Sequence, residues 1–177
     1  MGVVVAVVLL VVAVGSYVTW TAGRLDRLTA RVESAWNALD AQLVRRAAAA
    51  SDLAAHLRRR RLVDEEVALA LQHAAAATRG ASEEREAREN ELSRAVRDVL
   101  EAVDGRGGKT EALADELRTA GTRVRLARQF YNDAVRDNLT RRRRWLPRLL
   151  TVRHRDEPRR TFFEIDDSPA ADALAGT

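Results

Sequence analysis

The feature that most restricts the fold of this chain is the absence of proline before residue 147. Pro147, Pro158 and Pro169 are the only prolines in 177 residues. Proline breaks a helix because it lacks an amide hydrogen and its ring clashes with the preceding turn. The first 146 residues are therefore free to form long helices. Aromatic residues make up 5% of the chain and alanine is abundant, which favours slender, closely packed helices over a thick globular core.

The first 23 residues carry no acidic or basic side chain, and residues 3–14 are all valine, leucine and alanine. About 20 apolar residues in a helix cross a bilayer core of about 30 Å. We therefore predict a transmembrane anchor over residues 1–23, with Tyr17 and Trp20 at the headgroup level. A cleaved signal peptide is the alternative, but it requires a basic n-region that this segment lacks.

Arginines follow the predicted span, whereas none precedes it. Arg24, Arg27 and Arg31 lie within ten residues of its end. The positive-inside rule then places the N-terminus outside the cell and the rest of the chain in the cytoplasm. We expect a single-pass protein of the cell membrane that contacts the lipid bilayer through residues 1–23.

Apolar residues at three- and four-residue spacings predict helices throughout residues 24–144. The first helix continues from the membrane to about Arg61, and the second begins after the acidic residues 64–66. The third follows the glycine-rich loop 104–108, with Thr110 as its N-cap and a coiled-coil-like seam of apolar residues. The predicted fold class is all-α: an N-terminal transmembrane helix followed by an antiparallel up-and-down bundle of three to four long helices.

The number of helices depends on Gly80, which either kinks the second helix or turns the chain. With three helices, residues facing each other across loop 104–108 have numbers that add to about 212. The glutamates at 83, 84, 86, 89 and 91 then face Arg123, Arg125 and Arg128. If the chain turns at Gly80, four helices form and this matching fails.

After residue 144 the helical pattern ends, because Pro147 disfavours helix just ahead of itself. We expect residues 145–177 to form a short apolar turn at Trp145–Leu150 and a mostly disordered tail. Phe162 and Phe163 are the exception, since they provide a second apolar anchor in the tail.

Several stretches together carry a resemblance to a known family. They are the N-terminal span, then Val32, Ala35-Trp36, Leu39-Asp40-Ala41-Gln42-Leu43 and Arg45-Arg46, then Ala127-Arg128-Gln129-Phe130-Tyr131-Asn132-Asp133-Ala134-Val135, and finally Phe162-Phe163-Glu164. In order and spacing these resemble the LemA family. The resemblance implies a bacterial membrane protein with a bundle of long helices and no established enzyme activity or cofactor. Where the family usually has a proline this chain has Ala48-Ala49-Ala50-Ser51-Asp52-Leu53, which implies a straighter first helix.

The titratable residues do not form a recognisable catalytic or metal-binding pattern. The chain has no cysteine, and its histidines are His56, His73 and His154. A di-iron bundle would need two Glu-x-x-His motifs, and a phosphate loop would need glycines after a strand. Neither pattern occurs. We predict that the protein is not an enzyme and uses no metal or cofactor.

The most specific part of the resemblance surrounds Trp36 and Tyr131. Both lie on the apolar stripes of their helices, which favours core packing over partner binding. Asn132 and Asp133 lie beside the stripe, where they either bond across helices or form part of a partner-binding face. The sequence does not decide between these two roles.

Two runs of arginine are the strongest electrostatic feature of the chain. In a three-helix bundle both would lie at the membrane-distal tip and could bind an anionic partner. Basic residues are also favoured at helix C-termini by the helix dipole, and this is the simpler explanation. The residues are Arg58, Arg59, Arg60, Arg61, Arg141, Arg142, Arg143 and Arg144.

These features predict a membrane-anchored, non-enzymatic scaffold or adaptor that docks protein partners, with self-association through exposed helix stripes. The alternative is a membrane-anchored binder of anionic polymer or lipid through the arginine runs. Nucleic acid is not an expected partner, because stacking aromatics are scarce and only Trp145 lies near an arginine run.

Overall fold

The computed structural model describes residues 1–78, 84–145 and 161–166, and within these it gives no side-chain environment for residues 18, 21–26, 28 and 141–145. The described chain is all-helical and contains no strand. It comprises α1 (Gly2–Arg60), α2 (Glu65–Ala77), α3 (Arg85–Ala102) and α4 (Gly108–Trp145). The predicted all-α bundle is confirmed.

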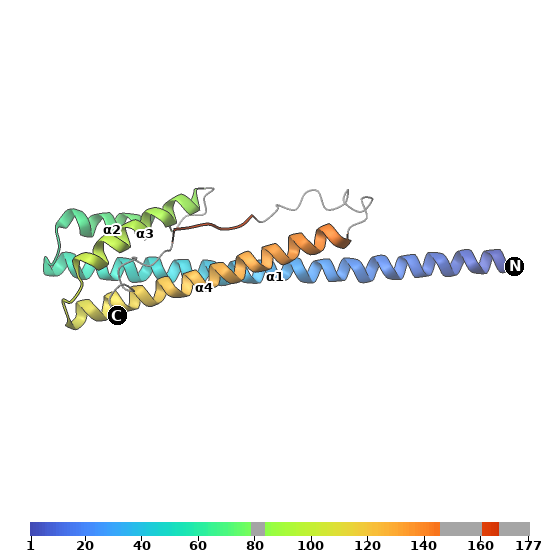
Figure 1. Cartoon of the computed structure of the whole chain (residues 1–177), viewed down its shortest axis with the longest axis horizontal. Helices are drawn as coiled ribbons and strands as arrows, with labels where there is room; N and C mark the ends of the chain where they lie inside the picture. Colours follow the sequence, from blue (N-terminus) through green and yellow to red (C-terminus); the bar gives the residue numbers. More distant parts are fainter. Residues whose placement is uncertain (79–83, 146–160, 167–177) are drawn as a thin grey trace, which may run out of the picture.

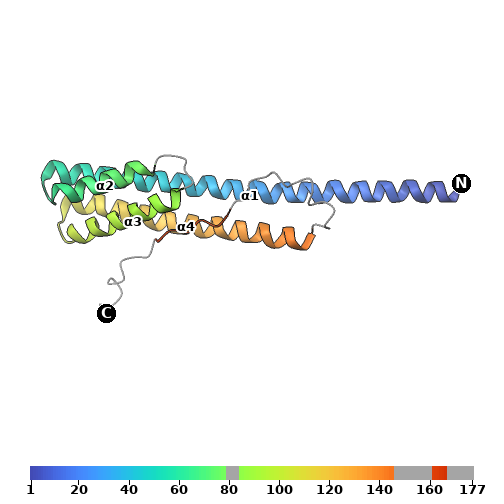
Figure 2. The ribbon, with the colours of Figure 1, turned by 90° about the horizontal axis from the view of Figure 1, so that it is seen from above.

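Helix α1 is a single helix of 59 residues that continues from the apolar N-terminal stretch into the bundle without a break. Its first part projects alone beyond the other helices (Figures 1 and 2). The large apolar side chains between Val3 and Val14 are 54–78% exposed. Over the residues that the structure describes, no helix is both long and apolar enough to cross a membrane.

The C-terminal end of α1 agrees with the predicted boundary near residue 61. Arg61 adopts the left-handed conformation, with φ 52° and ψ 43°, and its amide donates to the carbonyls of Arg58 and Leu57. This geometry closes the helix by satisfying carbonyls that lack a partner in the last turn. Glu65 and Glu66 then occupy the first turn of α2, where negative charge complements the helix dipole.

The chain turns between α2 and α3, so the four-helix alternative is correct. Helix α2 ends at Ala77 and α3 begins at Arg85, and Figures 1 and 2 show the two short helices side by side along the C-terminal half of α1. The glutamate–arginine matching of the three-helix alternative is wrong. Glu89 of α3 pairs with Arg46 of α1 at 2.6 Å and not with the arginines of α4.

Helix α4 runs antiparallel to α1 along much of its length (Figure 2). It begins at Gly108, three residues earlier than predicted. Thr110 is therefore not the N-cap but lies inside the first turn, where its hydroxyl is 3.2 Å from Nε2 of buried His56. The loop before α4 is formed as predicted, with Gly105 at φ 69° and Gly107 at φ 64°, a conformation that glycine adopts without a Cβ clash.

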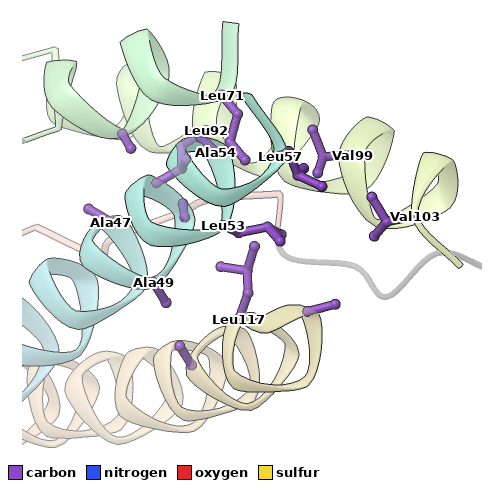
Figure 3. Close-up of a cluster of buried hydrophobic side chains, with 14 residues drawn as sticks. Ala47, Ala49, Leu53, Ala54, Leu57, Leu71, Leu92, Val99, Val103 and Leu117 are labelled. Carbon is purple, nitrogen blue, oxygen red and sulfur yellow. The ribbon is translucent and has the colours of Figure 1, made fainter. Parts of the chain in front are cut away.

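Two apolar clusters form the core. The first joins all four helices near the α1–α2 turn, and Figure 3 shows Leu53 and Leu57 of α1 meeting Leu71, Leu92 and Leu117. Alanines of α1 let the neighbouring helices approach closely; these are Ala47, Ala49, Ala50 and Ala54. The second cluster joins α1 and α4 to the segment 161–166. Its buried members are Val32, Leu39, Leu43, Val124, Tyr131, Ala134, Val135, Phe163 and Ile165.

Candidate functional site

An extended segment of the C-terminal region, Thr161–Asp166, lies along the bundle (Figure 1). Phe163 and Ile165 are 4% and 7% exposed, whereas Phe162, Glu164 and Asp166 are exposed. This alternation is typical of an extended chain, in which successive side chains point to opposite sides. We call the surface that receives it the segment groove, formed by Trp36 of α1, Glu86 and Asn90 of α3, and Tyr131 and Asn132 of α4.

Aromatic rings form the floor of the segment groove. The Trp36 ring meets Tyr131 edge to face, with centroids 5.3 Å apart, and meets Phe163 in the same way at 5.7 Å. Tyr131 is 2% exposed, and its hydroxyl donates to the carbonyl of Thr161 at 2.8 Å. The predicted core packing of Trp36 and Tyr131 is thus observed. It also forms an apolar surface against which Phe163 packs.

Asn132 holds both main-chain groups of one residue of the segment. Its Nδ2 donates to the carbonyl oxygen of Phe163 at 3.1 Å, and its Oδ1 accepts the amide of Phe163 at 3.0 Å. Asn132 is 9% exposed, whereas neighbouring Asp133 is exposed and pairs with Arg136 on its own helix. Of the two residues that the sequence left undecided, Asn132 contributes to the segment groove and Asp133 does not.

Helix α3 supplies the opposite wall through two side chains one turn apart. Glu86 Oε1 accepts the amide of Glu164 at 3.1 Å, and Asn90 Oδ1 accepts the amide of Asp166 at 2.7 Å. Residues four apart on a helix lie on one face, and alternate amides of an extended chain lie on one edge. The spacing of Glu86 and Asn90 therefore matches the repeat of the segment.

Basic side chains surround the acidic residues of the segment. Arg128 lies 3.4 Å from Glu164, and Arg97 lies 3.2 Å from Asp166. The guanidinium of Arg85 lies over the Trp36 ring, 5.7 Å from its centroid, a favourable cation–π arrangement. The segment groove is consequently apolar at its floor and positive at its rim.

A buried ion pair fixes α3 against α1 beside the segment groove. Arg46 lies 2.6 Å from Glu89, and their side chains are 5% and 0% exposed. Arg46 also donates to the Ser93 hydroxyl at 3.1 Å, and Arg85 reaches Asp40 at 2.5 Å. Burial raises the pKa of Glu89, while the positive charges of Arg46 and Arg85 act in the opposite direction.

The two arginine runs lie at opposite ends of the bundle, so the predicted tip of eight arginines is wrong. Arg58, Arg59, Arg60 and Arg61 are exposed where α1 ends, and Arg58 donates to Gln72 at 3.2 Å. Arg141, Arg142, Arg143 and Arg144 belong to the last turns of α4. The prediction failed because it assumed three helices, and the additional turn between α2 and α3 reverses the direction of the last helix.

Two contacts between α1 and α4 show which residues of the two antiparallel helices face each other, and therefore where α4 ends beside α1. Trp36 meets Tyr131 and His56 meets Thr110, so the residue numbers of facing pairs add to about 166. Both helices rise about 1.5 Å per residue. The same register places residues 141–144 opposite residues 22–25, where the basic stretch of α1 begins.

The histidines have separate environments. His56 is buried and His73 is exposed, and His154 lies outside the described residues. Burial lowers the pKa of His56, and the nearby charges of Lys109, Arg60 and Arg59 lower it further. Within the described ranges, no three histidine, aspartate or glutamate side chains are grouped so as to hold a metal ion.

Sequence reasoning predicted an apolar anchor at Phe162 and Phe163, and Phe163 has this role whereas Phe162 is 39% exposed. It missed that the anchor includes Ile165 and that Asn132 receives the segment. The alternation of apolar and acidic residues from Phe163 to Asp166 was the available signal. Residues 146–150, predicted to form an apolar turn, lie outside the described part of the chain, as does the tail after Asp166.

Comparison with known proteins gives no family assignment. No protein-family model matches the chain, and no curated protein matches it. The resemblance to the LemA family therefore stays a prediction.

Proposed function

We propose that this protein is a membrane-anchored, non-enzymatic helical adaptor that docks protein partners beside the membrane. The observation that carries the proposal is the exposed apolar part of α1, which continues as one helix into the core of the bundle. A contiguous apolar surface of this size on a soluble protein would be an aggregation hazard unless it were covered. A bilayer is the cover that an uncharged stretch of about 20 residues fits best.

The proposed anchor also determines where the bundle lies. Helix α1 continues without a break from residue 2 to residue 60. The anchor and the bundle would therefore be joined by a rigid helix and not by a flexible linker. The arginines after residue 23 favour a cytoplasmic bundle and an external N-terminus. Such an arrangement presents the segment groove at a fixed height above the lipid surface.

A second candidate function is the binding of anionic lipid at the cytoplasmic surface of the same membrane. The antiparallel course of α4 supports it, because this course brings residues 141–144 level with the start of the basic stretch of α1. Each basic residue near an anionic surface contributes about 1 kcal/mol of attraction. The lipid would then be held by the membrane-proximal arginines of both helices, and the distal run Arg58–Arg61 would not take part.

The anchor is tested by washing membranes from cells that produce the full chain with alkaline carbonate. We expect the protein to stay in the membrane pellet. The triple substitution Val7→Asp, Leu10→Asp and Val14→Asp should release it, because each central charge opposes insertion by about 3 kcal/mol. Removal of the unsubstituted chain by carbonate would refute the anchor.

The matched control is Val44→Asp with Leu126→Asp, which changes apolar side chains that are 54% and 47% exposed but belong to the bundle. This variant should remain in the pellet. Orientation is read by Ala170→Cys and a membrane-impermeant thiol reagent, since the chain has no other cysteine. Labelling in intact cells would reverse the proposed topology.

Binding of anionic lipid is tested with the triple variant Val7→Asp, Leu10→Asp and Val14→Asp, which lacks a working anchor. It is mixed with vesicles that contain one-third anionic lipid. Co-sedimentation should fall steeply as the salt concentration rises from about 50 to about 300 mM, as expected for screened charges. Changing Arg141–Arg144 to glutamine should weaken it, whereas changing Arg58–Arg61 should not. Equal losses from the two changes would argue against a membrane-proximal lipid site.

A further inference from the structure

We propose that the segment groove is a peptide-docking site and that Thr161–Asp166 is its built-in ligand, which a partner must displace. The partner would present an extended segment with an aromatic, an acidic, an aliphatic and a second acidic residue in succession. This inference rests on the proposed adaptor function, since it names the surface and the kind of partner that the adaptor would use. The contacts between the segment and the segment groove do not involve the membrane.

The segment groove recognises the main chain of its ligand. Asn132 binds the amide and carbonyl of Phe163, Glu86 the amide of Glu164, and Asn90 the amide of Asp166. Bonds of this kind fit any extended chain in the same register, as in other modes of strand-like peptide recognition. These main-chain bonds alone do not distinguish one extended sequence from another.

Selectivity comes from alternate side chains of the ligand. Phe163 packs against Trp36, and Ile165 is buried in the same cluster two residues later. Glu164 and Asp166 point out of the cluster toward Arg128 and Arg97. The recognised pattern is therefore aromatic–acidic–aliphatic–acidic, and a basic residue at either acidic position would meet an arginine of like charge.

The walls of the segment groove are held by contacts that do not involve the segment. The first apolar cluster joins all four helices and contains no residue of the segment, and the Arg46–Glu89 pair fixes α3 on α1. Departure of the segment would thus leave the bundle folded and expose Trp36 and Asn132. The docked segment therefore acts as a ligand that can leave, and the fold of the four helices does not require it.

The built-in ligand acts as a competitor because it belongs to the same chain. A tethered segment has an effective concentration in the millimolar range, so it closes the groove in most molecules when its own dissociation constant lies well below that concentration. The apparent affinity for a free peptide is lowered in proportion to the fraction of open grooves. Weakening the built-in segment should consequently strengthen the binding of an external copy.

The test uses the full chain in detergent micelles and a fluorescent peptide with the sequence of residues 161–166. Phe163→Ser with Ile165→Ser in the protein weakens the built-in ligand and leaves the segment groove unchanged. Fluorescence anisotropy should show at least about tenfold tighter peptide binding to this tail variant than to the unsubstituted chain. A peptide that carries the same two serines should not bind, and equal affinity of both proteins for the original peptide would overturn the proposal.

Groove substitutions are added to the tail variant. Asn132→Ala should abolish the gain, whereas Asp133→Ala, an exposed neighbour outside the segment groove, should leave it unchanged. Asn90→Ala serves as a second groove variant whose side chain is only half-buried, and circular dichroism checks that each variant is folded. Peptide binding that persists in both folded groove variants would place the site elsewhere.

Because the peptide-binding measurements are made in detergent, their failure leaves the carbonate test of the anchor unaffected, and failure of the anchor leaves them unaffected.

Discussion

Glu89 and Arg46 show at the scale of single residues how charge is accommodated in an alanine-rich core. The Glu89 side chain is 0% exposed, yet it meets Arg46 at 2.6 Å and lies within 3.9 Å of Arg85. Removal of an ion from water costs several kcal/mol, which the attraction of a buried partner offsets only if both are present. The pair therefore determines how α3 sits on α1 more than it adds stability.

Substitution of Glu89 by alanine should lower the free energy of unfolding by about 3–5 kcal/mol, because it leaves Arg46 buried without its partner. Urea denaturation followed by circular dichroism measures this change. Glu84→Ala is the matched control, since Glu84 pairs with Arg88 in an exposed setting and should cost less than about 1 kcal/mol. The double change Arg46→Met with Glu89→Leu should recover most of the loss, and a single-variant loss below about 1 kcal/mol would contradict the buried-pair argument.

His56 makes stability depend on pH in a defined direction. Its pKa is lowered in the fold from the ordinary value of 6.5, chiefly by burial. The unfolded chain therefore binds a proton at a higher pH than the folded chain does. The contribution of neutral His56 is complete above about pH 6.5 and is lost as the pH falls through the lowered pKa of the folded state.

The urea midpoint of the unsubstituted chain should accordingly fall between about pH 7 and about pH 5 by more than that of His56→Gln. Glutamine keeps a polar group near Thr110 but does not titrate. His73→Gln changes an exposed histidine and should retain the full pH dependence. Parallel curves for the unsubstituted chain and His56→Gln would exclude His56 as the source.

At the scale of elements, most of the helix boundaries follow from local signals. The end of α1, the start of α2 and the glycine loop before α4 correspond to an arginine run, an acidic cluster and clustered glycines. The break between α2 and α3 was left open because one glycine inside a helical pattern either kinks the helix or turns the chain. Only the packing of α2 against α1 and of α3 against α2 selects the turn.

The loop and helix glycines provide an element-scale prediction with an internal control. Gly107 has φ 64°, where a Cβ is strained, so Gly107→Ala should destabilise the protein by about 1 kcal/mol. Gly121 lies inside α4, and no atom of a neighbouring element lies within 4 Å of the position that a Cβ would occupy, so Gly121→Ala should stabilise by about 0.5–1 kcal/mol. Thermal unfolding compares the two, and shifts of the same sign would contradict the assigned conformations.

At the scale of the whole molecule, the direction of α4 decides where charge lies. Because α4 returns along α1, one arginine run lies beside the α1–α2 turn and the other lies near the proposed anchor (Figure 2). The same return brings Tyr131 and Asn132 to Trp36. The segment groove and the separation of the arginine runs thus have one common cause.

Spin labels measure that separation directly. The positions of Arg59→Cys and Arg142→Cys lie about 35 residues apart along α4 by the observed register, which corresponds to about 50 Å at about 1.5 Å per residue. Pulsed electron–electron double resonance on the full chain in micelles should report this distance. Arg59→Cys with Lys109→Cys is the matched pair at one end and should give a much shorter distance; similar values for the two pairs would support a single arginine tip and refute the antiparallel course of α4.

The sequence by itself determined the helical class, the C-terminal end of α1, the uncharged N-terminal stretch and the apolar stripes that contain Trp36 and Tyr131. These follow from local propensity and periodicity, which act between residues a few positions apart. The tertiary structure alone decided the turn between α2 and α3, the burial of the Arg46–Glu89 pair and the docking of Phe163 against Asn132. Each of these joins residues far apart in the chain or depends on packing against another helix, and no local pattern specifies which helix faces which.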